Sequence, residues 1–249
     1  MDCIRNIVTK SDTTAKARIA VLIPAWNEEG SIGRVIDDLP KDLAGGVIVA
    51  DNNSTDYTAE VAKKFGATVV HATQQGYGSA CLKGIEYLKA LPADQQPEIL
   101  VFIDADYSDY PDELPLVVDP IISDRADFVI GSRMLKPQPP GALLLQARLG
   151  NKLACFLMRL IWGVRYTDLG PFRAIRWKAL LDLNMIDPNF GWTVEMQIKA
   201  ARAKLRMEEV AVTYRPRIGH SKITGTVSGT VRAGYKILLT IFRYGLLKK

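Results

Sequence analysis

Apolar runs alternate with helical patterns along the first half of the chain. Five apolar runs predict buried β-strands, at 18–24, 46–51, 67–71, 101–106 and 127–131. Apolar residues at helical spacing separate the first four runs, at 31–39, 57–65 and 79–90. Strands that alternate with helices of this length are typical of βαβ units on a parallel sheet. The pattern therefore predicts an α/β fold.

The fourth run ends in two carboxylates, Asp104 and Asp106, which are one residue apart. Ligands of open α/β sheets bind at the carboxyl ends of the strands, and alternate residues of an extended chain point the same way. Both carboxylates can therefore face one spot, where a hard divalent cation that also touches phosphate oxygens would relieve their repulsion. Such a pair can also be an ordinary turn or helix cap. Whether it is a metal-binding pair must be judged from the residues at the other strand ends.

Those other strand ends are polar as well. Asp51 ends the second run and a polar turn follows it, while Gly76-Tyr-Gly78 opens the helix after the third run. The glycines would let the backbone approach a ligand and expose amides at a helix start, although a tight turn explains them equally well. Each strand exit thus carries groups that could build a site at one edge of the sheet.

The motifs at these strand ends resemble the successive signatures of family 2 glycosyltransferases with the GT-A fold. They are Pro24-Ala-Trp-Asn-Glu28-Glu29, Asp51-Asn-Asn-Ser-Thr-Asp56, Gly76-x-Gly78 and Asp104-Ala-Asp106. Later motifs are similar to those of the branch with dolichyl-phosphate mannosyl- and glucosyltransferases: Gly131-Ser-Arg133, Asp168-Leu-Gly-Pro-Phe-Arg173 and Arg217-Ile-Gly-His-Ser-Lys222. The resemblance covers residues 18–225 and implies a Rossmann-like, nucleotide-sugar-binding fold with a mixed, mostly parallel sheet flanked by helices.

The resemblance also implies how the first motifs would bind a nucleotide sugar. Asp106 is expected to ligate Mg²⁺ or Mn²⁺ directly, while Asp104 contacts the ribose, or the metal through water. Asp51 would accept a hydrogen bond from the nucleobase, and it could form an Asx turn with Ser54 at the same time. The remaining donor-binding residues are expected to be Pro24, Trp26, Glu28 and Gly78.

One departure from the family pattern concerns the metal. The polyprenyl-phosphate mannosyltransferase pattern continues Asp-Ala-Asp-Leu-Gln, whereas this chain has Ser108 at the position of the Gln. His220 is a candidate replacement, because GT-A enzymes often take a metal-ligating His from a C-terminal loop. A lone loop histidine can equally be a surface residue, so both interpretations stay open.

Three cations are candidates for binding the diphosphate of the donor. Arg133 follows the fifth strand, and a guanidinium there could hold a phosphate with two hydrogen bonds. Arg217 and Lys222 flank Gly219, on a loop whose composition suits a lid that closes over the site. Arg173 is a weaker candidate for the same role, and it could instead hold the loop around Asp168.

Glu195 is the candidate general base, because it matches the place where family 2 enzymes often keep their catalytic acid residue. An alcohol acceptor loses a proton as it attacks, so it needs such a base within hydrogen-bond reach. A phosphate acceptor is already an anion and needs none. Asp168 is a weaker candidate for the same role, and Glu195 could also be purely structural.

Charge is distributed unevenly, although the formal net charge is only +5. Residues 202–249 carry eleven Lys or Arg and two Glu, and residues 128–167 carry no acidic residue. Within the second stretch a helical apolar stripe stands beside Arg148, Lys152 and Arg159; the stripe is Leu149, Leu153, Phe156, Leu157 and Leu160. This pattern predicts either an interfacial helix on anionic lipid or a core-facing helix with a basic back.

The C-terminal tail, 235–249, is apolar but is interrupted by Lys236 and Arg243. It is too short and too charged to span a bilayer, which takes about 20 apolar residues. Membrane docking, plain packing or a contact in a homo-oligomer would each suit it. We therefore expect a frayed lead-in at 1–17, a glycosyltransferase domain at 18–225 and a basic amphipathic helix at 226–249.

The three cysteines have no paired spacing, which indicates a reducing compartment and neither disulfides nor a zinc site. The family resemblance implies an inverting, metal-dependent enzyme that moves a hexose from a UDP- or GDP-sugar to polyprenyl phosphate, and the basic amphipathic segments support the lipid acceptor; a cytoplasmic location is expected. Peripheral association with the cytoplasmic face of the membrane fits that acceptor. No nucleic-acid partner is expected.

Two other functions stay open. Transfer to a small soluble acceptor such as a phosphorylated glycerate is one, because Pro139-Pro-Gly-Ala142 partly resembles the acceptor loop of glycerate-modifying relatives. A sugar-phosphate nucleotidyltransferase is the other, but it would need a Gly-rich basic loop after the first strand. A dehydrogenase would need Gly-x-Gly-x-x-Gly at that turn. Pro24-Ala-Trp-Asn-Glu28-Glu29 offers neither loop.

Overall fold

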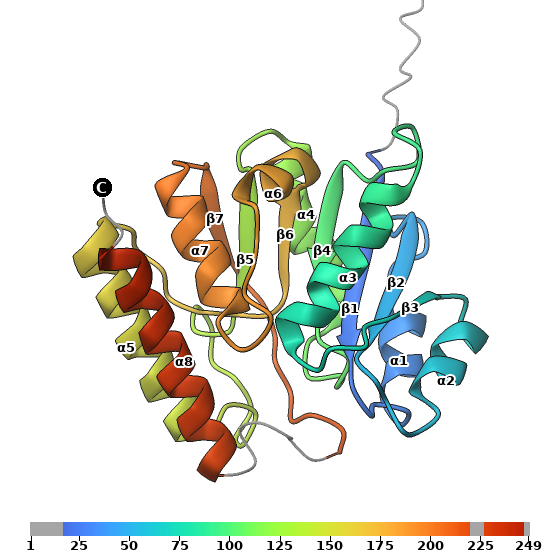
Figure 1. Ribbon diagram of the computed structural model, residues 1–249, viewed down its shortest axis with the longest axis horizontal. Helices are drawn as coiled ribbons and strands as arrows, with labels where there is room; N and C mark the ends of the chain where they lie inside the picture. The colour runs from blue at the N-terminus through green and yellow to red at the C-terminus, as the bar shows by residue number, and fades with distance from the viewer. Residues whose placement is uncertain (1–16, 220–226, 247–249) are drawn as a thin grey trace, which may run out of the picture.

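The computed structural model describes residues 17–219 and 227–246, and within them a seven-stranded sheet of order β3-β2-β1-β4-β6-β5-β7 (Figure 1). The predicted βαβ half is confirmed. Its strands pair in parallel; they are β1 (Ile19–Ala25), β2 (Gly46–Asp51), β3 (Thr68–His71) and β4 (Ile99–Phe102). The helices between them are α1 (Ile32–Asp37), α2 (Thr58–Lys64) and α3 (Tyr77–Ala90).

The second half makes the sheet mixed, as the resemblance implied. Strand β6 (Arg173–Arg176) lies antiparallel between β4 and β5 (Phe128–Ser132), and β7 (Met207–Ala211) pairs in parallel with β5 at the edge. Hydropathy did not reveal β6 or β7, because β6 has an arginine at each end and β7 is a half-buried edge strand with two glutamates.

Helices cover both faces of the sheet and divide the core into two layers. Alternate residues of each strand serve opposite layers, as Leu22 and Ile23 show. One layer packs α1, α2 and α4 (Leu114–Ile122), which follows a short 3₁₀ turn at Pro111–Glu113. The other packs α3, α5 (Leu145–Trp162), α6 (Trp177–Leu183), α7 (Trp192–Arg202) and α8 (Val227–Leu246). Figure 1 shows α3 and α7 in front of the sheet and α4 behind it.

The structure of helix α5 contradicts one of the two interpretations of the basic helical stripe, namely that its apolar side faces the core. Its buried residues are Asn151, Ala154, Cys155 and Met158, whereas Leu149, Leu153, Phe156 and Leu160 are exposed. Four of the five stripe residues therefore point away from the core, and the fifth, Leu157, is partly buried against it. Helix α8 packs beside α5 and against α7, and none of the helices in the described part of the chain is long and apolar enough to cross a bilayer.

Candidate active site

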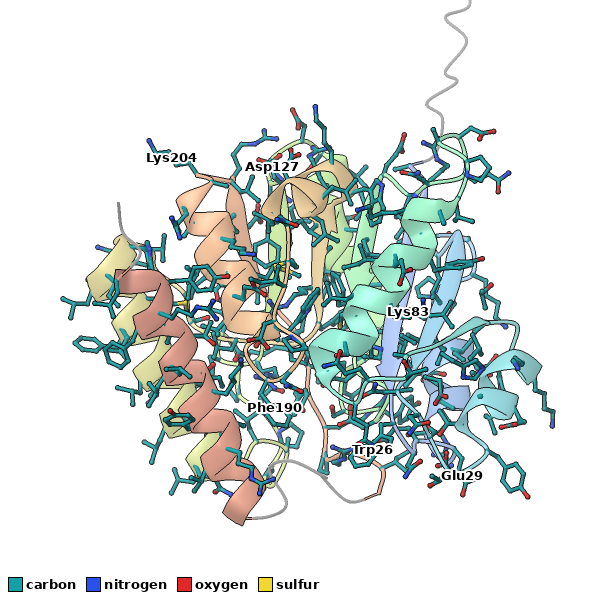
Figure 2. All side chains as sticks on the ribbon, in the orientation of Figure 1. Trp26, Glu29, Lys83, Asp127, Phe190 and Lys204 are labelled. Carbon is teal, nitrogen blue, oxygen red and sulfur yellow. The ribbon has the colours of Figure 1, made fainter. Side chains whose placement is uncertain are left out.

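A cavity of about 380 Å³ opens at the carboxyl ends of β1 and β4, where ligands of open α/β sheets bind. Six of the predicted site residues line it: Pro24, Trp26, Glu28, Asp104, Asp106 and Arg217. Figure 2 shows Trp26 and Phe190, which also lines the cavity, both at the lower end of the sheet. The structure therefore brings these six residues together around one cavity.

The two carboxylates that follow β4 are held in different surroundings. Asp106 accepts hydrogen bonds from the backbone N–H and hydroxyl of Ser108, at 2.9 and 2.5 Å. Asp104 accepts one from the hydroxyl of Tyr77 at 3.1 Å. Burial, and next the negative charge of Asp106, raise the pKa of Asp104 to about 7. A bound cation would favour its ionised form.

Arg217 supplies the positive charge at this end of the cavity. Its guanidinium lies 2.6 Å from Glu28 Oε1 and 3.1 Å from Asp106 Oδ2. The next residue, Ile218, donates its backbone N–H to the carbonyl of Asp106 at 3.0 Å. The loop that carries Arg217 is thus fastened to the acidic motif by both backbone and side chain, and a diphosphate entering here would meet a cation already in place.

The acidic pair fits a divalent metal that binds together with its substrate. Mg²⁺ is typically held by one or two protein carboxylates and completes its shell with substrate phosphates and water, and Asp104 and Asp106 offer such oxygen ligands. Within 17–219 and 227–246, no three His, Cys, Asp or Glu side chains gather to hold a metal without a substrate. His220 and Lys222 lie outside the described residues, so their predicted roles stay predictions.

Asp51 is not among the residues that line the cavity. It is buried, its Oδ2 lies 3.0 Å from His71 Nδ1, and its Oδ1 accepts the N–H of Ser54 at 3.3 Å. This is the Asx-turn arrangement that the sequence left open. The next residue, Asn52, lines the cavity instead, and holds its wall by donating to the carbonyl of Gln74 and accepting from the N–H of Gly76.

Gly78 faces protein backbone, not the cavity. A Cβ at this position would lie 1.9 Å from the carbonyl oxygen of Asp187, and the N–H of Ser79 donates to the carbonyl of Pro188 at 2.8 Å. Gly76 has φ +145°, a conformation that L side chains rarely adopt. The glycines therefore allow the segment 187–189 to pack against the start of α3, and that segment forms part of the cavity wall.

Arg133 also points elsewhere than the sequence suggested. Its guanidinium makes two hydrogen bonds to the fully buried carboxylate of Asp168, at 2.8 and 2.9 Å, and its backbone N–H makes a third. Burial would raise the pKa of Asp168, but the charge and hydrogen bonds of Arg133 hold it below its usual value. Neither residue lines the cavity, so in this structure the pair joins the end of β5 to the loop before β6.

Arg173 holds the same loop from inside, which is the alternative left open for it. It is buried, and it donates to the carbonyls of Leu169, Gly170 and Thr193. Burial lowers the pKa of Arg173 to about 10. Buried hydrogen bonds of Arg173 thus hold the motif from Asp168 to Arg173 to itself and to Thr193 at the start of α7.

Glu195 is fully buried in the first turns of α7 and does not line the cavity. Its carboxylate accepts the N–H of Asp187 at 2.8 Å and the hydroxyl of Tyr244 at 2.7 Å, and it pairs with Lys199 at 2.8 Å. These contacts fit the structural alternative, because they hold the segment before α7 and tie it to α8. In this geometry Glu195 is not within reach of an acceptor in the cavity.

Sequence reasoning assigned no role to five polar or aromatic residues that line the cavity: Asn52, Gln75, Tyr77, Asn189 and Phe190. Asn52, Gln75 and Tyr77 lie inside or beside motifs that were recognised, so proximity to those motifs was the available signal. Asn189 and Phe190 enter from a segment more than eighty residues away in sequence, and no local pattern marks them.

Asp109 provides a test of how acidic this region is. It is buried, neither of its oxygens meets a hydrogen-bond donor among the described residues, and burial followed by the charge of Asp104 raises its pKa well above the usual value. The folded state therefore keeps a proton that the unfolded state releases, so stability falls as the pH rises above about 4.

We expect Asp109→Asn to remove this loss of stability at higher pH. Its melting temperature should fall less than that of the wild type between about pH 5 and pH 8, as measured by calorimetry. The matched control is Asp94→Asn, which changes an exposed carboxylate. It should leave the difference between the melting temperatures at the two pH values as it is in the wild type. Equal pH dependence in Asp109→Asn and the wild type would contradict the assignment.

Comparisons with known proteins identify the family of the chain. The model of the family described as "Glycosyl transferase family 2" matches residues 20–182. An uncharacterised glycosyltransferase of Mycobacterium tuberculosis is 36% identical over 86% of this chain and 94% of its own length. A dolichyl-phosphate hexose transferase of Haloferax volcanii is 35% identical over 85% of this chain and 89% of its own.

Among solved structures, the fold is similar to glucosyl-3-phosphoglycerate synthase from Mycobacterium tuberculosis in complex with Mn²⁺, uridine diphosphate and phosphoglyceric acid. The TM-score is 0.72 at 23% identity, covering 93% of this chain and 79% of that one. The family model and these relatives show that the chain belongs to glycosyl transferase family 2, and with the fold they identify it as a glycosyltransferase with a GT-A fold.

Proposed function

We propose that the protein transfers a hexose from a nucleotide diphosphate sugar to polyprenyl phosphate, with inversion and with the help of Mg²⁺ or Mn²⁺. The observation that carries this proposal is the acidic pair Asp104 and Asp106, which meets Arg217 at the mouth of the cavity. That arrangement suits a metal-bound diphosphate. A divalent cation held there would stabilise the charge that grows on the leaving diphosphate.

Arg217 takes part in the same stabilisation. Before the donor binds, its guanidinium is shared between Glu28 and Asp106. With a metal at Asp106, the guanidinium would be released from that carboxylate and would be available to the diphosphate while it keeps its pair with Glu28; a cation placed in advance stabilises developing charge. His220 and Lys222 belong to the same proposal, as third metal ligand and second phosphate-binding cation.

The base and ribose are assigned to the neighbouring wall. Pro24, Trp26 and Asn52 line it together with Tyr77, whose hydroxyl is bonded to Asp104. Asp51 would then act from beneath, by fixing the turn that presents Asn52. A relative with this fold holds uridine diphosphate and Mn²⁺, which supports a UDP-sugar as the donor.

The carboxylates of the cavity favour a phosphate acceptor. In the described part of the chain the lining contains Glu28, Asp104 and Asp106; Arg217 pairs with the first and third, and the metal would occupy the acidic pair. Glu195 lies outside the lining, so none of them is free to deprotonate an alcohol. A phosphate needs no base, and a relative 35% identical is named as a dolichyl-phosphate hexose transferase.

A transfer assay tests the proposal. The enzyme is incubated with UDP- or GDP-hexose, Mn²⁺ and either polyprenyl phosphate or 3-phosphoglycerate, and the products are identified by mass spectrometry. We expect a lipid-linked sugar and free nucleoside diphosphate. Sugar on the glycerate alone would contradict the acceptor, and release of pyrophosphate would contradict the reaction class.

A further inference from the structure

Helices α5 and α8 expose a row of large apolar side chains. On α5 the row consists of Leu145, Leu149, Leu153, Phe156 and Leu160. On α8 it consists of Val231, Tyr235, Leu239, Phe242 and Leu246. The spacing along the two helices is the same, and the exposed fractions range from 46% to 87%. We call these ten residues the α5–α8 face.

The two rows lie close together at one edge of the molecule. The helices pack against each other, and a Cβ on Gly245 would lie 3.4 Å from Ile161, so their C-terminal ends meet. Figure 1 shows them side by side at the left edge, far from β3. A soluble surface rarely carries so many neighbouring apolar side chains without a binding partner.

The charges around the α5–α8 face share one sign. Neither helix contains an acidic residue. Five exposed cations belong to the two helices: Arg148, Lys152, Arg159, Arg232 and Arg243. If a second copy of the chain covered this face, like charges would be brought together, which is costly at an interface. The same cations would attract anionic lipid, because each Lys or Arg near an anionic membrane surface strengthens the binding.

We propose that the α5–α8 face docks on an anionic bilayer. The leucine and aromatic side chains enter the boundary between headgroups and acyl chains, and the arginines and lysine contact the headgroup phosphates. Apolar area and opposite charge are both needed, because each contribution by itself gives weak, reversible binding. The helices lie on the membrane in this arrangement and do not cross it.

Two contacts connect the docked helix to the cavity. Tyr244 of α8 donates to Glu195, and Lys236 of α8 lies 2.9 Å from Asp187. Glu195 and Asp187 hold the segment before α7, whose Phe190 lines the cavity. Docking would thus act on a segment that forms part of the cavity wall. This consequence rests on the proposed function, whereas docking itself does not.

Co-sedimentation with lipid vesicles tests the proposal. The vesicles contain phosphatidylcholine, with or without phosphatidylglycerol, and neither sugar donor nor polyprenyl phosphate. We expect the protein to bind the anionic vesicles, and salt to weaken the binding. Phe156→Ser/Phe242→Ser should lower the affinity by about tenfold or more, since two buried aromatic contacts are lost. Arg148→Gln/Arg159→Gln should lower it as well.

The matched control is Leu116→Ser/Ile122→Ser, which changes two apolar residues of α4 that are 43% and 49% exposed and should leave binding unaltered. Melting temperatures of all variants verify folding. Absence of binding to anionic vesicles, or equal loss in the control, would overturn the proposal. So would self-association by light scattering that Phe156→Ser/Phe242→Ser abolishes. Because the vesicles carry no substrate, these outcomes are independent of the transfer assay.

Discussion

Asp106→Asn is expected to lower the rate constant of sugar transfer by about 10²–10³-fold, the effect of removing a main electrostatic contact to developing charge. The substitution keeps the size of the side chain and its capacity to accept the hydrogen bonds of Ser108. It removes the negative charge that would hold the metal and that pairs with Arg217. Steady-state kinetics with saturating Mn²⁺ measure the change, and thermal unfolding checks that the fold is retained.

Asp112→Asn is the control for this prediction. It makes the same chemical change at an exposed carboxylate six residues further along the chain, and it should leave the rate within about twofold, as surface changes away from a site usually have small effects. If Asp106→Asn retained full activity with the metal present, the ligand assignment would be wrong.

Arg133→Met is expected to lower the free energy of unfolding by about 3–5 kcal/mol, because it leaves a buried carboxylate without its counter-ion. The carboxylate is that of Asp168, which is fully buried and bound by two guanidinium hydrogen bonds. In the double variant Arg133→Met/Asp168→Asn the charge is removed as well, so much of the stability should return. Chemical denaturation measures all three proteins.

Lys83→Met provides the comparison, because it breaks a surface ion pair with Glu86 and should cost no more than about 1 kcal/mol. If Arg133 instead held the diphosphate of the donor, Arg133→Met would weaken nucleotide binding with little change in stability. That result would contradict the structural role that its contacts with Asp168 indicate.

The sequence predicted the first half of the fold well for a physical reason. Strands that are buried on both faces need continuous apolar runs, as in β1, β2 and β4. Strand β6 is short and carries an arginine at each end. One of them, Arg173, is buried and donates hydrogen bonds to backbone carbonyls. Strand β7 is only half buried. Neither strand needs an apolar run, so hydropathy could not reveal them.

The candidate site likewise contains residues that the sequence pattern could locate and residues that it could not. Residues that follow strands, such as Trp26, Asp104 and Asp106, lie around one cavity because the strand order brings those strand ends together. Arg133 and Glu195 were assigned from residue type and position, but their surroundings depend on partners distant in sequence, Asp168 and Tyr244. Local patterns do not encode such long-range pairs, so a charged residue expected in the cavity can instead be part of its support.

The most direct measurement is an anomalous difference map from crystals that contain the protein, Mn²⁺ and uridine diphosphate. The account predicts one manganese peak in direct contact with the Asp106 carboxylate and the diphosphate, with Arg217 turned toward the phosphates. A nucleotide bound in the cavity without a metal at Asp106, or a manganese peak at some other carboxylate, would contradict it.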